Sequence, residues 1–227
     1  MQLTGYERYF RAQFEAEEAS LMVNLTTQLA MLLQSNYDEP ADPDPLLASL
    51  EIGGSDAPSS DPAIARLLPD AYADPELAAK YRLVSERALA NRISADAETI
   101  AHLFQEKQLD DSALAEQLEN FSSLEKALGA SGAGRGEGAK MPKITLKITE
   151  ADAPMWLRTI THLRLTLAER SGFNDPSEYD ALRQNPESAP MMAVFEWLSG
   201  LSEGFTQMLL GRLPNEEDVE AAEAAEE

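Results

Sequence analysis

Histidine is the side chain best suited to acid–base chemistry near neutral pH, and the sequence contains two, His102 and His162. Glu98 and His102 are four residues apart in a segment with helical spacing, which would place both side chains on one helix face. Such a pair can supply two metal ligands, but a site needs more, and no pattern names them. We therefore interpret the pair as solvated and His162 as a helix-surface residue rather than a general base, and we predict no metal site.

Beyond the histidines, the sequence holds no pattern typical of an active site. It has no cysteine, which excludes disulfide bonds, thiolate zinc sites and cysteine nucleophiles. It contains no nucleophile elbow, dinucleotide fingerprint or zinc-protease helix. The glycines of residues 129–138 are not followed by the Lys-Ser/Thr pair of a phosphate loop. We predict that the protein is not an enzyme and uses no cofactor.

The charge of the chain is strongly negative. Forty acidic residues against 18 basic residues give a formal net charge of −22. Such a chain repels the phosphate backbone of nucleic acids and anionic lipid headgroups. Arg82, Arg87 and Arg92 recur along one expected helix, but acidic residues share it, and no basic helix–turn–helix is present. We predict no direct binding of nucleic acid.

The hydrophobic pattern indicates neither secretion nor membrane insertion. Residues 1–20 lack the apolar core of a signal peptide. No apolar run approaches the ~20 residues that a membrane-spanning helix needs. We therefore predict a cytoplasmic protein without membrane contact.

Two segments alternate apolar and polar residues with the period of a half-buried strand, RYFRAQF at 8–14 and KITLKIT at 143–149. Their apolar positions are Phe10, Ala12, Phe14, Ile144, Leu146 and Ile148. Since two short strands are marginal alone, we predict that they pair as an antiparallel ribbon lying on helices.

Most of the remaining chain has helical spacing. We expect helices over residues 15–33, 62–68, from 75 to beyond 100, 111–128, 150–171 and 188–211. The apolar stripe of the first is Leu21, Leu25, Leu29 and Leu32. The long helix that begins at Pro75 has two stripes, one of Leu77, Tyr81 and Val84 and another of Leu89, Ile93, Ile100 and Phe104. The stripe of the helix that contains Trp156 is Trp156, Ile160, Leu163 and Leu167.

These elements predict a mainly α, bundle-like fold with a small two-stranded antiparallel ribbon. We expect one helical domain over residues 1–213, with flexible loops at 36–61 and 129–141 that are rich in Pro, Gly and Ser. Residues 214–227 carry seven acidic residues and few large apolar ones, so we expect a disordered acidic tail.

Most of the chain resembles a family known mainly from actinobacteria and catalogued as a domain of unknown function. The segments that carry the resemblance are the strand that enters the first helix, DPLLASL at 44–50, DPAIARLLPDAYADPE at 61–76, WLRTITHLRLTL at 156–167 and VFEWLSGL at 194–201. The chain departs from the family pattern at AERSGF, residues 168–173, which puts any role for Arg170 in doubt. The resemblance implies a gene neighbourhood, since genes of this family often lie beside the gene for the adaptor that delivers substrates to the Clp protease. Some members are labelled transcriptional regulators.

The absence of catalytic patterns and the family's gene neighbourhood together favour a protein-binding function. We predict a non-enzymatic regulatory or adaptor-like factor that binds another protein, in a setting of Clp-type protein quality control. A transcription-associated regulator is the alternative, and a metal-dependent or hydrolytic enzyme is less favoured. The sequence defines neither the partner nor the oligomeric state.

Four residues, Arg66, Asp70, Tyr72 and Arg164, are the candidates for an interaction site or a structural lock. A guanidinium among apolar residues needs a carboxylate or carbonyl partner, because its burial is otherwise costly. One interpretation is that Arg66 or Arg164 pairs with Asp70 or a nearby acid and fixes the PDAY turn onto the helix that contains Trp156. The other interpretation is that Arg66 or Arg164 lies exposed in a cleft with Tyr72 and binds an acidic partner segment.

Overall fold

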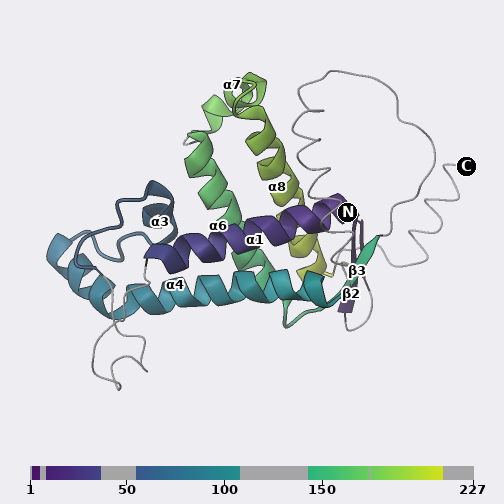
Figure 1. The fold of residues 1–227 in the computed structure, drawn as a ribbon, viewed down its shortest axis with the longest axis horizontal. Helices are drawn as coiled ribbons and strands as arrows, with labels where there is room; N and C mark the ends of the chain where they lie inside the picture. The colour runs from purple at the N-terminus through teal and green to yellow at the C-terminus, as the bar shows by residue number, and fades with distance from the viewer. Residues whose placement is uncertain (1, 6–8, 37–54, 108–142, 174, 212–227) are drawn as a thin grey trace, which may run out of the picture.

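The computed structural model describes residues 2–5, 9–36, 55–107, 143–173 and 175–211 (Figure 1). The strands are β1 (Gln2–Gly5), β2 (Tyr9–Phe14) and β3 (Ile144–Thr149). The helices are α1 (Ala16–Asn36), α3 (Pro62–Leu67), α4 (Pro75–Glu106), α6 (Ala153–Ser171), α7 (Tyr179–Gln184) and α8 (Ala189–Leu209), with a short 3-10 turn η1 (Pro176–Glu178) before α7. The predicted mainly α fold is confirmed. None of the described helices is both long and apolar enough to cross a bilayer.

The predicted antiparallel pairing of the two alternating segments is confirmed. β2 pairs with β3 so that Phe10 lies opposite Ile148 and Ala12 lies opposite Leu146. β1 pairs with the other edge of β2, so the sheet has three strands in the order β1-β2-β3. The third strand was not predicted, because its four residues are too few to show an alternating pattern.

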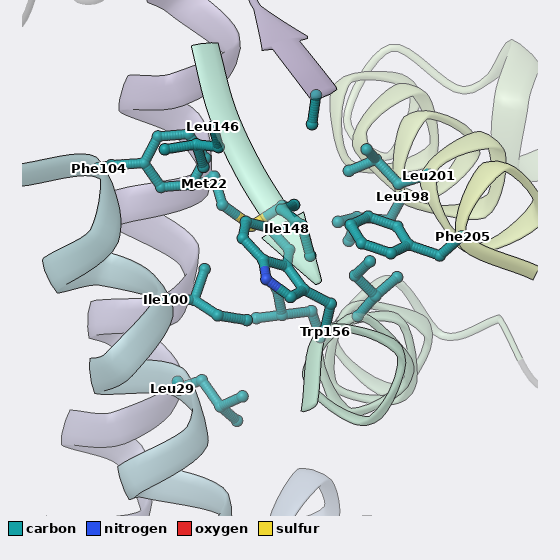
Figure 2. Packing of buried hydrophobic residues seen from close by; sticks show 14 of the residues in the cluster. Met22, Leu29, Ile100, Phe104, Leu146, Ile148, Trp156, Leu198, Leu201 and Phe205 are labelled. Carbon is teal, nitrogen blue, oxygen red and sulfur yellow. The ribbon is translucent and has the colours of Figure 1, made fainter. Parts of the chain in front are cut away.

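The core lies where the sheet meets the helices, and Trp156 of α6 is at its centre (Figure 2). The Trp156 ring stacks on Phe205 of α8, with centroids 5.3 Å apart, and on Phe14 of β2, at 6.3 Å. Phe104 of α4 meets Trp156 edge-on at 6.0 Å. One aromatic cluster therefore joins the sheet to three helices. Aromatic ring pairs of this kind add to the stability that apolar burial alone provides.

Helices α1 and α4 run side by side in opposite directions, and α6 and α8 form a second pair that crosses them (Figure 1). With 21 and 32 residues, α1 and α4 are about 32 and 48 Å long. In the last turns of α1, Gln34 donates a hydrogen bond through Nε2 to Oε1 of Glu98 at 2.5 Å. α1 therefore ends beside the C-terminal half of α4, and the N-terminal half of α4 extends past it on the side of α3 (Figure 1).

The apolar stripe predicted for α6 is confirmed for three of its four members, since Trp156, Ile160 and Leu163 are buried and Leu167 is half-buried. The stripe predicted for α1 is only partly correct. Of its four members only Leu29 is fully buried, and the other buried large residues of α1 are Met22, Thr26 and Leu33. The other three, Leu21, Leu25 and Leu32, are half-buried, and Leu25 and Leu32 line a cavity of about 490 Å³ between α1 and α6.

The stripe predicted for the start of α4 is wrong. Leu77, Tyr81 and Val84 are 48, 39 and 56% exposed. The opposite face is buried instead and consists of Ala78, Arg82, Glu86 and Ala90. Beyond this point the prediction holds for Ile93, Ile100 and Phe104, whereas Leu89 is exposed. The physical reason is the length of α4, because its N-terminal half has no α1 to cover its apolar face.

Helix starts follow their sequence signals closely. Asp61 and Asp74 cap α3 and α4 by accepting backbone hydrogen bonds, and each is followed by proline at the first helical position. α6 begins at Ala153, later than predicted, and Oδ2 of Asp152 accepts hydrogen bonds from both the backbone N–H and the hydroxyl of Thr149. The predicted helix 111–128, the linker 129–141, the tail 214–227 and most of the loop 36–61 lie outside the described residues.

Candidate functional site

Helix α3 is attached to the last turn of α6 by two reciprocal ion pairs. Nη1 of Arg66 on α3 donates to Oε2 of Glu169 on α6 at 3.0 Å. In the opposite sense, Nη2 of Arg170 on α6 donates to Oδ2 of Asp61 at 2.6 Å. Burial of Asp61 raises the pKa of its carboxyl, but hydrogen bonds from Arg170 and from the backbone N–H of Ala63 outweigh it and hold that pKa below its ordinary value.

The turn after α3 is attached to α4 rather than to α6. Arg82 is 7% exposed, and its Nη1 donates to Oδ1 of Asp70. Nη2 of Arg82 donates to the backbone carbonyl of Asp56 at 2.6 Å. An arginine therefore does fix the predicted Asp70 turn, but it is neither Arg66 nor Arg164. Sequence reasoning missed Arg82 because it was grouped with other arginines along the same helix.

Arg164 does not have the carboxylate that its apolar neighbours led us to expect. Its guanidinium lies 5.0 Å from the centre of the Phe195 ring on α8, a cation–π contact. Among the described residues no carboxylate lies within ion-pair distance of Arg164, and its Nε atom is buried without a hydrogen-bond partner. The aromatic face substitutes for the predicted acid, so Arg164 is separate from the Asp70 turn.

Tyr72 is on the surface beside the start of α4. It is 49% exposed, and its ring meets Tyr81 edge-on at 5.8 Å. With Leu77 and Val84 these tyrosines form an exposed apolar surface, which we name the α4 surface and define as Tyr72, Leu77, Tyr81 and Val84. The last three share one helix face, because they are separated by four and three residues.

A cavity of about 280 Å³ lies next to the α4 surface, between the end of α3, the middle of α4 (residues 81–96) and α6. Leu67, Leu89 and Ile93 supply much of its apolar lining, and Tyr81 lines it too. Its charged lining residues are Arg82, Glu86, Arg92, Asp96 and Arg158. The site therefore combines apolar walls with a group of charges, an arrangement typical of a binding pocket.

Most of the charges around this cavity are paired. Nε and Nη2 of Arg158 on α6 donate to Oδ2 of Asp96 on α4 at 2.9 and 2.8 Å. Glu86 differs: it is 4% exposed, and its Oε2 atom is buried with no hydrogen-bond partner among the described residues. A buried carboxylate oxygen without a donor is costly, which marks Glu86 as the unusual group of the site.

His162 also lines the cavity, half-buried on α6. Burial of the imidazole, together with the positive charge of nearby Arg158, lowers its pKa below the ordinary value. These two effects outweigh Asp96, which raises that pKa. The imidazole is therefore neutral at pH 7, and its Nδ1 atom is buried without a hydrogen-bond partner among the described residues. The predicted surface position of His162 is only partly correct, because the ring faces a cavity rather than open solvent.

The other histidine is part of no cluster of metal-ligating groups. Glu98 and His102 are both exposed on α4, and Glu98 already accepts a hydrogen bond from Gln34. Within residues 2–5, 9–36, 55–107, 143–173 and 175–211, no three or more His, Asp or Glu side chains are grouped so that they could hold a metal ion.

The fold and the site define the class of the protein as a small, mainly α domain. A three-stranded sheet lies at one end of the domain, and a cavity with charged lining residues lies at the other end, beside the exposed apolar face of α4. The family model described as domain of unknown function (DUF2017) matches residues 4–209. The chain belongs to this family. No match is found among curated proteins or among solved structures.

Proposed function

We propose that the protein is a non-enzymatic cytoplasmic factor that binds another protein through the N-terminal half of α4. The observation that carries this proposal is the α4 surface, where Leu77, Tyr81 and Val84 are exposed on one helix face while Arg82 and Glu86 are buried on the opposite one. Contiguous exposed apolar side chains rimmed by polar residues are typical of protein-interaction sites. Tyrosine supports this further, because its large ring loses little conformational entropy on binding.

The setting that we propose is Clp-type protein quality control in actinobacteria, as an adaptor-like or regulatory factor. This part of the proposal rests on the gene neighbourhood of the family that the sequence resembles. The net charge of −22 argues against the alternative of a regulator that contacts DNA directly, because nonspecific affinity for DNA comes from cations.

A capture experiment tests the proposal. Purified full-length chain is immobilised, incubated with native actinobacterial lysate, and the bound proteins are identified by mass spectrometry. The test variant is Leu77→Gln/Val84→Gln, because glutamine removes the apolar side chains but keeps high helix propensity. The matched control is Met31→Gln/Leu210→Gln, which removes two large exposed apolar side chains, 62 and 56% exposed, from other parts of the molecule.

The expected result is a defined set of proteins bound by the wild type and the control but reduced at least ~10-fold with the α4 variant, because truncation of the hot-spot side chains of an interface costs about 2 kcal/mol or more. Components of the Clp system in that set would support the proposed setting. Equal capture by all three proteins would contradict a role for the α4 surface. Specific retention of duplex DNA at ~150 mM salt would favour the transcription-associated alternative.

A further inference from the structure

Glu86 lies at the cavity wall, and one oxygen of its carboxyl group has no partner among the described residues. It is 4% exposed, no basic group among the described residues lies within ion-pair distance of it, and its Oε2 atom has no hydrogen-bond partner there. The guanidiniums of Arg82 and Arg158, which also line the cavity, are engaged by Asp70 and Asp96. The cavity thus offers a carboxyl oxygen without a partner, and its complement is a group that donates a hydrogen bond, such as the head of a lysine or arginine side chain.

The chemistry of the other lining residues fits a side chain and its adjoining backbone in a peptide segment better than a small free amine. The Nε atom of Arg82 is buried without a hydrogen-bond partner, so the site also holds a donor that a backbone carbonyl could satisfy. Leu67, Leu89 and Ile93 provide apolar walls, which suit the aliphatic stem of lysine or arginine. At about 280 Å³ the cavity is below the ~300–1,000 Å³ of pockets that enclose whole small ligands, and it fits one anchoring side chain.

The cavity is continuous with the α4 surface. Tyr81 belongs to both, since its side chain lines the cavity and is 39% exposed. A segment that inserts a side chain beside Glu86 therefore leaves the cavity past Tyr81, where the α4 surface begins. Arg92 is exposed at the rim, about 1.7 helical turns after Glu86. It is the one arginine of the lining without an acidic partner among the described residues, and solvent screens its repulsion of an incoming cation.

We infer that the cavity beside Glu86 binds a lysine or arginine side chain of a partner protein, within a segment whose flanking residues are apolar. The inference rests on the proposed function and names the partner chemistry for the same surface. Overall charge favours it too, because a chain with a net charge of −22 attracts basic segments. Within the chain itself, residues 37–54 contain no lysine or arginine, whereas residues 108–142 contain Lys126, Arg135 and Lys140.

The test is selection from a displayed random nonapeptide library on immobilised full-length chain. Selections are run in parallel on the wild type, on Glu86→Gln, and on Glu106→Gln, a matched control that neutralises an exposed acid at the end of the same helix. Glutamine keeps the shape of glutamate and cannot ionise, and the Oε2 atom of Glu86 makes no hydrogen bond with the described residues that the change would break. Thermal unfolding of each variant checks that its fold is intact.

The wild type and Glu106→Gln are expected to enrich peptides with Lys or Arg between apolar residues, and Glu86→Gln is expected to bind the same peptides at least ~10-fold more weakly, as loss of a buried charge partner predicts. If Glu86→Gln fails to fold, the selected peptides are synthesised again with norleucine in place of the basic residue, and their affinity for the wild-type protein is measured. The same loss of affinity is expected for these peptides.

Enrichment of apolar peptides without a basic residue, equally on all three proteins, would overturn the inference and leave the proposed function standing. No enrichment on any protein would overturn both. A further selection uses Lys126→Gln/Arg135→Gln/Lys140→Gln. Enrichment of basic peptides on this variant alone would show that the chain's own segment occupies the cavity, which would overturn a partner as the occupant.

Discussion

The two halves of α4 bury opposite kinds of residue. In the C-terminal half, Ile93, Ile100 and Phe104 face inward and pack between α1 and the Trp156 cluster. In the N-terminal half, Arg82 and Glu86 occupy the inward face, and the large apolar residues point to solvent. Both halves belong to one uninterrupted helix, so neither helix propensity nor a break in the backbone explains the difference.

What differs is the surface that each half meets. The C-terminal half lies beside α1, which ends near Glu98, and is enclosed by aromatic rings. The N-terminal half meets the Asp70 carboxylate and a backbone carbonyl, which need donors, and Arg82 supplies them. The apolar face of that half is left uncovered. The apolar face of the C-terminal half of α4 therefore stabilises the fold, whereas the apolar face of the N-terminal half is exposed to solvent.

The largest effect that sharpens this comparison is expected in the aromatic cluster of α6 that encloses the C-terminal half of α4. Trp156→Ala removes the ring that contacts Phe14, Phe104 and Phe205, and it should lower the free energy of unfolding by about 3–5 kcal/mol, measured by urea denaturation. Trp156→Phe is the control, and its cost should be much smaller because it keeps a ring and removes a buried indole N–H that has no partner among the described residues.

A smaller loss is expected at the buried charge of the other half. Arg82→Met keeps the volume of the side chain but removes its hydrogen bonds to Asp70 and to the Asp56 carbonyl. The cost should be about 2 kcal/mol, because Asp70 is half-exposed and becomes hydrated when its partner is lost. Arg92→Met, at an exposed position on the same helix, should change stability by less than ~0.5 kcal/mol. If Arg82→Met costs more than Trp156→Ala, the division of α4 into a stabilising and a binding half is wrong.

A third effect concerns the attachment of α3, and it depends on pH. Asp61→Asn removes the ion pair with Arg170 but keeps a good N-cap, so it should cost about 0.5–1 kcal/mol at pH 7. The pKa of Asp61 is lower in the folded state, so its contribution is present above about pH 4 and is lost as the pH falls through the folded pKa. The difference in unfolding free energy between wild type and variant should therefore shrink in acid. A difference that stays constant down to pH 2 would contradict this role of Asp61.

Sequence patterns predicted the elements better than the faces that they bury. The strands were predictable because alternation in β2 and β3 matches a sheet with one covered face. In α4 the inward residues Ala78, Arg82, Glu86 and Ala90 recur every four positions, but a hydrophobic pattern assigns such residues to solvent. Only the position of the Asp70 turn, set by tertiary packing, explains why Arg82 faces inward.

The candidate site was predicted in its residue types but not in its pairs. An arginine was expected to hold Asp70, and one does, but it is twelve residues away on α4 rather than on α3 or α6. Arg66 pairs with Glu169, 103 residues away, in the segment where the chain departs from the family pattern. Pairing across such distances depends on how helices dock, which spacing within one helix does not reveal.

The smallest effect on stability is expected where the effect on binding is largest. Leu77→Gln/Val84→Gln replaces two exposed apolar residues of the α4 surface with a residue of high helix propensity, so the free energy of unfolding should change by no more than about 0.5 kcal/mol in urea. The same substitution at a buried pair of α4, Ile93→Gln/Ile100→Gln, should prevent stable folding, because it buries two amides in an apolar core. The contrast would show that the two halves of α4 differ in role although they share one helix. A loss of several kcal/mol from Leu77→Gln/Val84→Gln would instead mean that these side chains are covered within the chain, and the α4 surface would then be part of the fold rather than a binding site.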